Sequence, residues 1–302
     1  MVEFSLCCTL EGHNSPINCV SFGEGGYLAT GSDDGHIILW SLAEQCEVLH
    51  IRPKQGAIMS LKWVVSLLTS TEWFLLSGGA DGTLQLQRLS NDKRTSVLLS
   101  MHTVFAGAIS CIDVNDARST VAVTGPGRVV LFKIVAGNLD PMQCISADPP
   151  FSHDPKPAFA ISVHFFKQGK GILVCYLDSH EIVAFCVSPW KELWRQKLIN
   201  RIGSSAYSDP LSYLLVWNLL DAIEVYQLTD NPTCHLLLIK TLHVRIRRNH
   251  ICDVQFDCTG KSAISGSDNG EVHLWDIDRG QLKQVLLHGK GKQCWHNLCF
   301  HH

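Results

Sequence analysis

The chain has 302 residues, of which 46% are hydrophobic and 18% are charged, so it is able to bury a sizeable core and is not a disordered segment. Its formal net charge of −3 gives no overall attraction to nucleic acid or to an anionic membrane. The sequence has no secretory leader and no apolar run of about 18 residues, and it therefore predicts neither secretion nor a membrane span.

Thirteen cysteines are scattered along the chain, and none forms a Cys-x-x-Cys pair. Without a secretory signal, they are interpreted as small hydrophobic residues of a reduced protein. The sequence therefore favours a cytoplasmic protein, with the nucleus as the alternative location.

One hairpin motif recurs from the first part of the chain to the last. Residues 31–40 read Gly-Ser-Asp-Asp-Gly-His-Ile-Ile-Leu-Trp, and related segments follow at residues 78–86 and 266–276. A tight Asp-Gly or Asn-Gly turn joins two short strands, and the second strand alternates before it ends in an aromatic residue. The position at the end of this second strand recurs six times, at a period of roughly 40–50 residues: Trp40, Gln87, Phe132, Phe185, Tyr226 and Trp275.

Alternating segments ahead of the hairpins predict a first strand in four units, at residues 17–22, 58–63, 109–114 and 251–256. The fourth and fifth units are degenerate, but residues 161–165, 172–176, 211–217 and 223–226 still predict strands. We expect one all-β domain over residues 1–302, with repeats at about 12–53, 54–101, 102–146, 147–198, 199–243 and 244–287.

These repeats resemble the WD40 family, which implies an all-β propeller with six recognisable repeats. In that family an N-terminal strand usually closes the last blade, and residues 1–11 are expected to do so here. Residues 281–287 also predict an outer strand for the sixth repeat. We therefore favour a seven-blade plan with an incomplete last blade in residues 288–302, with a closed six-blade ring as the alternative.

The resemblance also assigns a structural role to residues that would otherwise suggest catalysis. A structural tetrad is expected from His13, Thr30 or Ser32, Asp34 and Trp40. Of the later repeats, the second keeps Asp81, and the sixth keeps Trp275 but has Asn269 in place of the aspartate. The alternative, a hydrolase with Ser32 as nucleophile and His13 as base, has no further motif to support it, and we expect no enzymatic activity.

The family implies that partner peptides bind the loops on the top face of the propeller. Loop positions there, besides the His13 loop, are Lys54, Phe105, Lys156, Arg245, Arg247 and Arg248. The arginine cluster suits an acidic peptide or an RNA backbone, although nucleic acid is the less favoured partner of a chain without a basic surface. A proline-rich stretch at residues 148–157 is interpreted as a loop insertion, with a docking strip as the alternative.

The sequence therefore predicts a non-catalytic scaffold that binds other proteins and needs no cofactor, no metal and no small-molecule substrate. The Cys-x-His-x-x-Cys-x-His tail at residues 294–301 departs from structural zinc spacings. Two further functions stay as alternatives: an RNA-associated subunit and a ubiquitin-ligase adaptor. The adaptor interpretation requires Trp-Asp-x-Arg, whereas here Trp275-Asp276 is followed by Arg279, one residue late.

Overall fold

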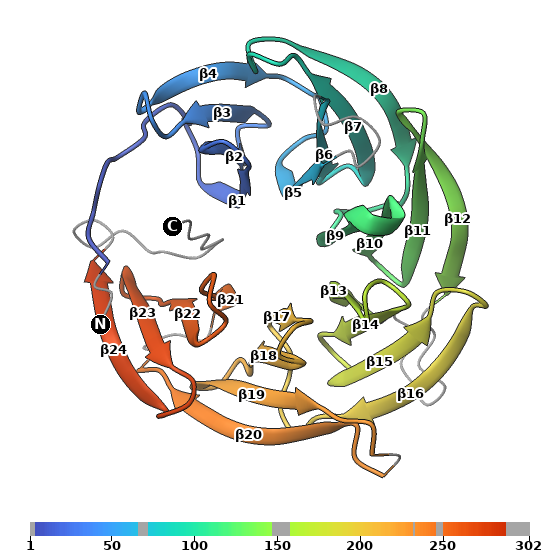
Figure 1. The fold of residues 1–302 in the computed structure, drawn as a ribbon, viewed down its shortest axis with the longest axis vertical. Coiled ribbons are helices and arrows are strands. Elements are labelled where there is room, and N and C mark those ends of the chain that lie inside the picture. The colour runs from blue at the N-terminus through green and yellow to red at the C-terminus, as the bar shows by residue number, and fades with distance from the viewer. Residues whose placement is uncertain (1–3, 66–71, 147–157, 232, 246–249, 288–302) are drawn as a thin grey trace. The chain divides into compact units, whose positions relative to one another are not determined.

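The computed structural model describes residues 4–65, 72–146, 158–231, 233–245 and 250–287. These residues form twenty-four strands and one short 3-10 turn at Asp116–Arg118, and they contain no α-helix. The strands occur in groups of four along the chain (Figure 1). The first three groups are β1 (Ile17–Gly23), β2 (Tyr27–Ser32), β3 (Ile37–Ser41), β4 (Cys46–Ile51); β5 (Ile58–Val65), β6 (Trp73–Gly79), β7 (Thr83–Leu89), β8 (Ser96–Thr103); and β9 (Cys111–Asn115), β10 (Thr120–Gly125), β11 (Arg128–Val135), β12 (Asn138–Ser146).

The last three groups include the two repeats, the fourth and the fifth, that the sequence analysis described as degenerate. The three groups are β13 (Ala160–Phe166), β14 (Gly171–Tyr176), β15 (Glu181–Cys186), β16 (Lys191–Lys197); β17 (Ser204–Ser208), β18 (Tyr213–Trp217), β19 (Ala222–Leu228), β20 (Leu236–His243); and β21 (Val254–Phe256), β22 (Ser262–Gly266), β23 (Glu271–Asp276), β24 (Gln281–Leu287). The degenerate fourth and fifth repeats therefore form complete sheets. The fifth begins at β17, which the sequence analysis did not predict.

Each group is a four-stranded antiparallel sheet in chain order, which is the blade of a β-propeller. The third and fourth strands of all six sheets share one irregularity, a β-bulge next to the position of Trp40, Gln87, Phe132, Phe185, Tyr226 or Trp275. The six repeats that the sequence predicted are thus six copies of one blade.

The hairpin turns explain why the motif needs glycine. Gly35, Gly82 and Gly270 all have φ near +80° (79°, 80° and 81°), a left-handed conformation that other residues rarely adopt. One residue earlier, a side-chain oxygen of Asp34, Asp81 or Asn269 accepts the backbone N–H two residues further on. Asparagine and aspartate can both form this bond, and the sixth repeat therefore keeps its turn despite Asn269.

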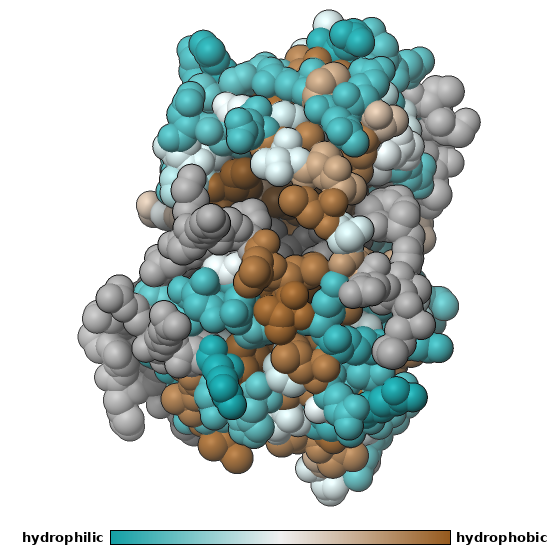
Figure 2. Space-filling model, turned by 90° about the vertical axis from the view of Figure 1, so that its left-hand side faces the viewer, coloured by the Kyte–Doolittle hydropathy of each residue, from teal (hydrophilic) through white to brown (hydrophobic). Residues whose placement is uncertain are grey.

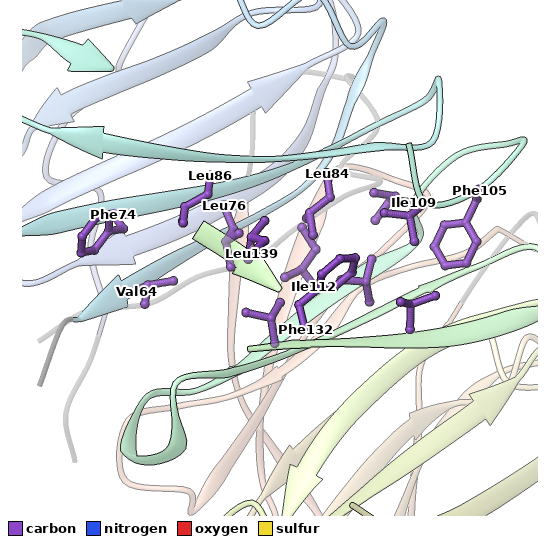
Figure 3. Close-up of a cluster of buried hydrophobic side chains, with 14 residues drawn as sticks. Val64, Phe74, Leu76, Leu84, Leu86, Phe105, Ile109, Ile112, Phe132 and Leu139 are labelled. Atoms are coloured by element: carbon purple, nitrogen blue, oxygen red, sulfur yellow. The ribbon is translucent and has the colours of Figure 1, made fainter. Parts of the chain in front are cut away.

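The chain divides into two compact units, one of residues 8–174 and the other of residues 1–7 and 175–302. In the first unit, a core of buried side chains lies between the second and third sheets, including Leu76, Leu84 and Ile112 (Figure 3). In the second unit, Trp217 and Val254 belong to a core shared by the fifth and sixth sheets. Each core therefore lies between consecutive blades.

The described residues contain six blades, in agreement with the six-blade alternative rather than with the favoured seven-blade plan. The residues proposed for a partial seventh blade, 288–302, lie outside the described residues. The N-terminal segment also differs from the expectation, because described residues 4–16 form no strand. The sixth sheet already has an outer strand, β24, and Phe4 is instead bound through the side-chain amide of Gln284 on that strand.

Candidate interaction face

A chain of hydrogen bonds joins four predicted residues of the first sheet. The ring of His13 lies 3.0 Å from Asp34 Oδ2 through Nδ1 and 2.8 Å from Thr30 Oγ1 through Nε2. Trp40 donates its indole N–H to the same Thr30 oxygen at 2.9 Å. Because the His13 side chain is only 3% exposed, these bonds satisfy polar groups that water does not reach.

Ser32, the alternative to Thr30, has a different place in the structure. Its hydroxyl donates to the backbone oxygen of Ser15 at 3.1 Å and accepts the backbone N–H of Asp34 at 3.2 Å. The hydrogen bonds of His13 therefore go to Asp34 and Thr30, and not to Ser32. The serine–histidine pair that a hydrolase would need is not formed.

The electrostatics of Asp34 follow from the same contacts. Burial alone would raise the pKa of this carboxyl, but the backbone N–H groups of His36 and Asn14 and the ring of His13 outweigh it. The pKa of Asp34 consequently lies below its usual value, and the carboxylate is stabilised in its charged form.

In the second sheet, a residue that the sequence analysis missed occupies the place of the histidine. Gln55 is fully buried, accepts the hydroxyl of Ser77 at 2.7 Å and donates to the backbone oxygen of Thr83 at 2.7 Å. Asp81, the predicted residue of this repeat, bonds to the backbone N–H and hydroxyl of Thr83. The signal in the sequence was the position of Gln55, one residue after the place that corresponds to His13.

These side chains fasten loops at one end of the sheets, and we call residues 12–16, 33–36, 53–57, 80–83 and 104–107 the loop face. The backbone N–H of Asp33 donates to Pro16 at 3.0 Å, and that of Asp81 donates to Gln55 at 3.3 Å. The next loop joins the same end because Val104 donates to Gly82 at 2.8 Å. Hydrogen bonds thus hold residues 12–16 to residues 33–36, and residues 53–57, 80–83 and 104–107 to one another, within the unit of residues 8–174.

The predicted binding residues differ in their exposure. Lys54 is exposed on the loop face, and Arg245 is exposed two residues after the end of β20. The expectation for Phe105 is wrong, because its side chain is only 3% exposed and lies beside Ile109 in the core of Figure 3. Gly125 leaves room for this ring, and Arg128 lies over it at 5.6 Å. Lys156, Arg247 and Arg248 lie outside the described residues.

The fifth sheet uses a buried carboxylate in place of the tetrad. Glu224 accepts the side-chain amides of Asn200 at 2.7 Å and Asn218 at 3.1 Å, and the hydroxyl of Tyr226 at 2.5 Å. Tyr226 occupies the position of Trp40, so this blade also has a buried hydrogen-bond network, although its residue types differ from those of the tetrad. A glutamate between isoleucine and valine on an inner strand was the available signal in the sequence.

The sixth sheet keeps the tetrad's tryptophan without its hydrogen bond. The indole nitrogen of Trp275 and the hydroxyl of Ser265, which takes the place of Thr30, are both buried and without a partner among the described residues. The turn is held instead by Ser267, whose hydroxyl bonds to Asn269 and to the backbone oxygen of Glu271. Packing therefore carries more of the stability of this blade than it does in the first.

Two further observations bear on the chemistry of the chain. The described ranges contain no group of three or more side chains that would ligate a metal. Within the same ranges, no helix has the length and apolar character needed to span a membrane.

Comparison with known proteins gives a family. The sequence profile described as "WD domain, G-beta repeat" matches residues 4–41 and 239–276, the first and last repeats. The chain carries WD40 repeats. The first matched stretch contains all four residues of the hydrogen-bonded tetrad, and both stretches end at the hairpin's tryptophan and the residue after it.

Curated proteins match parts of the chain, and two of the three described here are named for WD repeats. WD repeat-containing protein 90 of Mus musculus is 26% identical over 137 residues, which cover 42% of this chain and 7% of that protein. WD and tetratricopeptide repeats protein 1 of Homo sapiens is 31% identical over 103 residues, 33% of this chain and 15% of that protein. THO complex subunit 6 homolog of Danio rerio is 33% identical over 98 residues, 29% of this chain and 28% of that protein. The matches thus span less than a third of each relative.

Proposed function

We propose that this WD40-repeat protein is a non-catalytic scaffold that binds partner proteins through its loop face. The observation that supports the proposal is the set of hydrogen bonds that ties neighbouring loops together through His13, Gln55 and the hairpin turns. A preordered loop surface loses little conformational entropy on binding, so its contacts contribute more fully to affinity.

Lys54 and Asn14 are the side chains best placed to contact a partner. Both are exposed, and none of the hydrogen bonds that hold the loop face uses either side chain among the described residues. Changing these two side chains therefore alters the surface without breaking the hydrogen bonds that hold the loops. An acidic or polar protein segment suits this part of the face.

The test is quantitative affinity purification of the tagged wild-type chain and of Lys54→Glu, with Lys133→Glu as the matched control. Lys133 is exposed on β11, paired with Thr120 and thus at the end of the third sheet away from its hairpin turn. We expect specific partners to be depleted by Lys54→Glu and retained by Lys133→Glu. Equal recovery of partner proteins by wild type and the variants would contradict the proposal that the loop face binds them.

A role as subunit of a larger assembly is consistent with the relatives, since one of them is named as a complex subunit. RNA association stays a second candidate because Arg245 is exposed in the described part of the cluster. Replacing Arg245, Arg247 and Arg248 by alanine should then abolish RNA retention and flatten its salt dependence. No structural observation favours the ubiquitin-ligase adaptor.

A further inference from the structure

Among the described residues, the fourth strand of each sheet has a strand neighbour on one side only. Its outer row of backbone N–H and C=O groups is a template for a further strand, and proteins commonly protect such edges with charged residues or proline. Five of the six outer strands carry such a residue: Glu47 on β4, Pro141 on β12, Glu192 on β16, Lys240 on β20 and Lys283 on β24. Strand β8 reads Ser-Val-Leu-Leu-Ser-Met-His-Thr and carries none.

The contrast holds at matched positions of the ladder. Trp40 pairs with Glu47, Phe132 with Pro141 and Phe185 with Glu192, whereas the corresponding residue of the second sheet, Gln87, pairs with Leu98. A protecting residue is therefore missing from β8 at the place where three other blades have one. Strands β20 and β24 also have leucine here, Leu238 and Leu282, but each keeps its lysine elsewhere.

Strand β8 exposes apolar side chains on both faces of the sheet: Leu98 and Met101, opposite Gln87 and Gln85, lie on one face, and Val97, opposite Arg88, lies on the other. Val97, Leu98 and Met101 are 52%, 51% and 57% exposed. Exposed hydrophobic side chains also occur elsewhere on the molecule, as on the side that Figure 2 shows, but here they coincide with an unprotected strand edge. A long, uncharged, hydrophobic edge strand is a site at which another strand pairs.

Contacts with the third sheet hold the other residues of β8 in place. The hydroxyl of Ser100 accepts the backbone N–H of Leu139 at 3.4 Å, and the ring of His102 lies 5.4 Å from that of Phe132. The nearest charge across the ladder, Arg88 opposite Val97, is paired with Glu72 at 3.5 Å. Two residues of β8 are thus tied to the third sheet, and the charge beside the edge is compensated.

We propose that the outer edge of β8 binds an extended, uncharged, apolar peptide segment of a partner protein, which joins the second sheet as a fifth strand. The open backbone groups fix the extended conformation, because only another strand satisfies them in sequence. The lack of charge on β8 fixes the chemistry, since a charged residue in the segment would lose water without gaining a partner. A single strand pair is a small interface for two folded domains, which commonly bury ~1,200–2,000 Å², and it suits a peptide better than a second copy of the chain.

The site is separate from the loop face, because it uses a strand edge rather than the turns at the end of the sheet. Its test is therefore independent of the proposed function. Failure of the Lys54→Glu experiment would leave this site untouched, and the reverse also holds.

The probe is a phage-displayed library of random short peptides. Peptides are selected on the wild-type chain, and their enrichment is compared with their enrichment on Leu98→Lys. The control is Leu238→Lys, an equally exposed leucine at the matching position of β20. We expect selected peptides to be apolar and uncharged, to bind Leu98→Lys at least about tenfold more weakly than wild type, and to bind Leu238→Lys unchanged. Equal melting temperatures of the variants would show that folding is preserved.

Backbone methylation of a selected peptide tests the strand pairing itself. Methyl groups on the alternate peptide nitrogens whose N–H groups face β8 should abolish binding. Methyl groups on the other alternate nitrogens, whose N–H groups face away from β8, should leave binding unchanged. Two results would overturn the proposal: no peptide enriched for wild type over Leu98→Lys, or loss of binding in both methylation registers. Light scattering provides a third, since a wild-type dimer that Leu98→Lys converts to a monomer would make a second copy the occupant.

Discussion

The indole nitrogen of Trp40 lies 2.9 Å from the hydroxyl oxygen of Thr30, and this oxygen is also 2.8 Å from the ring of His13. The Thr30 hydroxyl therefore joins Trp40, on a strand, to His13, a loop residue that lies 17 positions before Thr30 in the chain. Ser265 and Trp275 repeat the residue types in the sixth sheet without the bond. The two blades thus offer a matched comparison of the same motif with and without its polar lock.

Replacing His13 by alanine should destabilise the chain by about 1–3 kcal/mol, because Thr30 and Asp34 would each lose a buried partner. Chemical denaturation measures this change. His50→Ala is the control, since His50 is exposed and its one ion-pair contact, with Glu47, lies at the surface. Equal stability of the two variants would contradict a structural role for His13.

The matched tryptophans should respond differently to phenylalanine. Trp40→Phe removes a satisfied donor and leaves Thr30 with one partner fewer, at a cost of about 1–2 kcal/mol beyond the lost packing. Trp275→Phe removes an indole N–H that has no partner in the described residues, so only the packing loss remains. Unfolding free energies of both variants test the difference. A larger loss for Trp275→Phe would mean that its indole nitrogen has a partner in solution.

The repeated hairpins could be predicted from the sequence because their residues act locally. Gly35, Gly82 and Gly270 are required by the turn itself, and alternation defines the strands around them. The tetrad of the first blade was implied by the resemblance to the WD40 family, with Thr30 and Ser32 as alternatives. Only the positions of the two hydroxyls relative to His13 distinguish them.

The remaining features depend on contacts between distant residues, which no local pattern reports. Phe105 lies in a loop, as its repeat position predicts, but its side chain is buried because Gly125 provides space for its ring. Gln55 and Glu224 replace the histidine chemistry with other polar groups, so a search for the family's residue types passes over them. The edge of β8 differs from the other outer strands at the bulge, whose place depends on strand pairing that the local sequence does not report.

Alkaline pH should unfold the chain partly through Tyr226. Burial raises the pKa of this phenol, and its hydrogen bond to Glu224 raises it further, so the folded state favours the neutral form. A group with a raised folded pKa stabilises the protein below its unfolded pKa, about 10 for tyrosine, and this contribution is lost as the pH rises above that value. Unfolding free energies measured from about pH 8 to about pH 11 should therefore fall more steeply for wild type than for Tyr226→Phe. Parallel curves would contradict this contribution.

Gln284→Ala should release the N-terminal segment from the sixth sheet. The side-chain amide of Gln284 accepts the backbone N–H of Phe4 at 2.9 Å and donates to its backbone oxygen at 2.6 Å, so one side chain replaces a pair of ladder bonds. The Phe4 side chain also packs against the buried cluster of Ile264, Val272 and Leu274. We expect faster hydrogen exchange at the Phe4 amide in Gln284→Ala, and unchanged exchange in Gln281→Ala, whose exposed side chain lies on the same strand. If Phe4 exchanged at the same rate in both variants, the apolar contacts of its ring alone would hold the segment, and Phe4→Ala would then be the change that frees it.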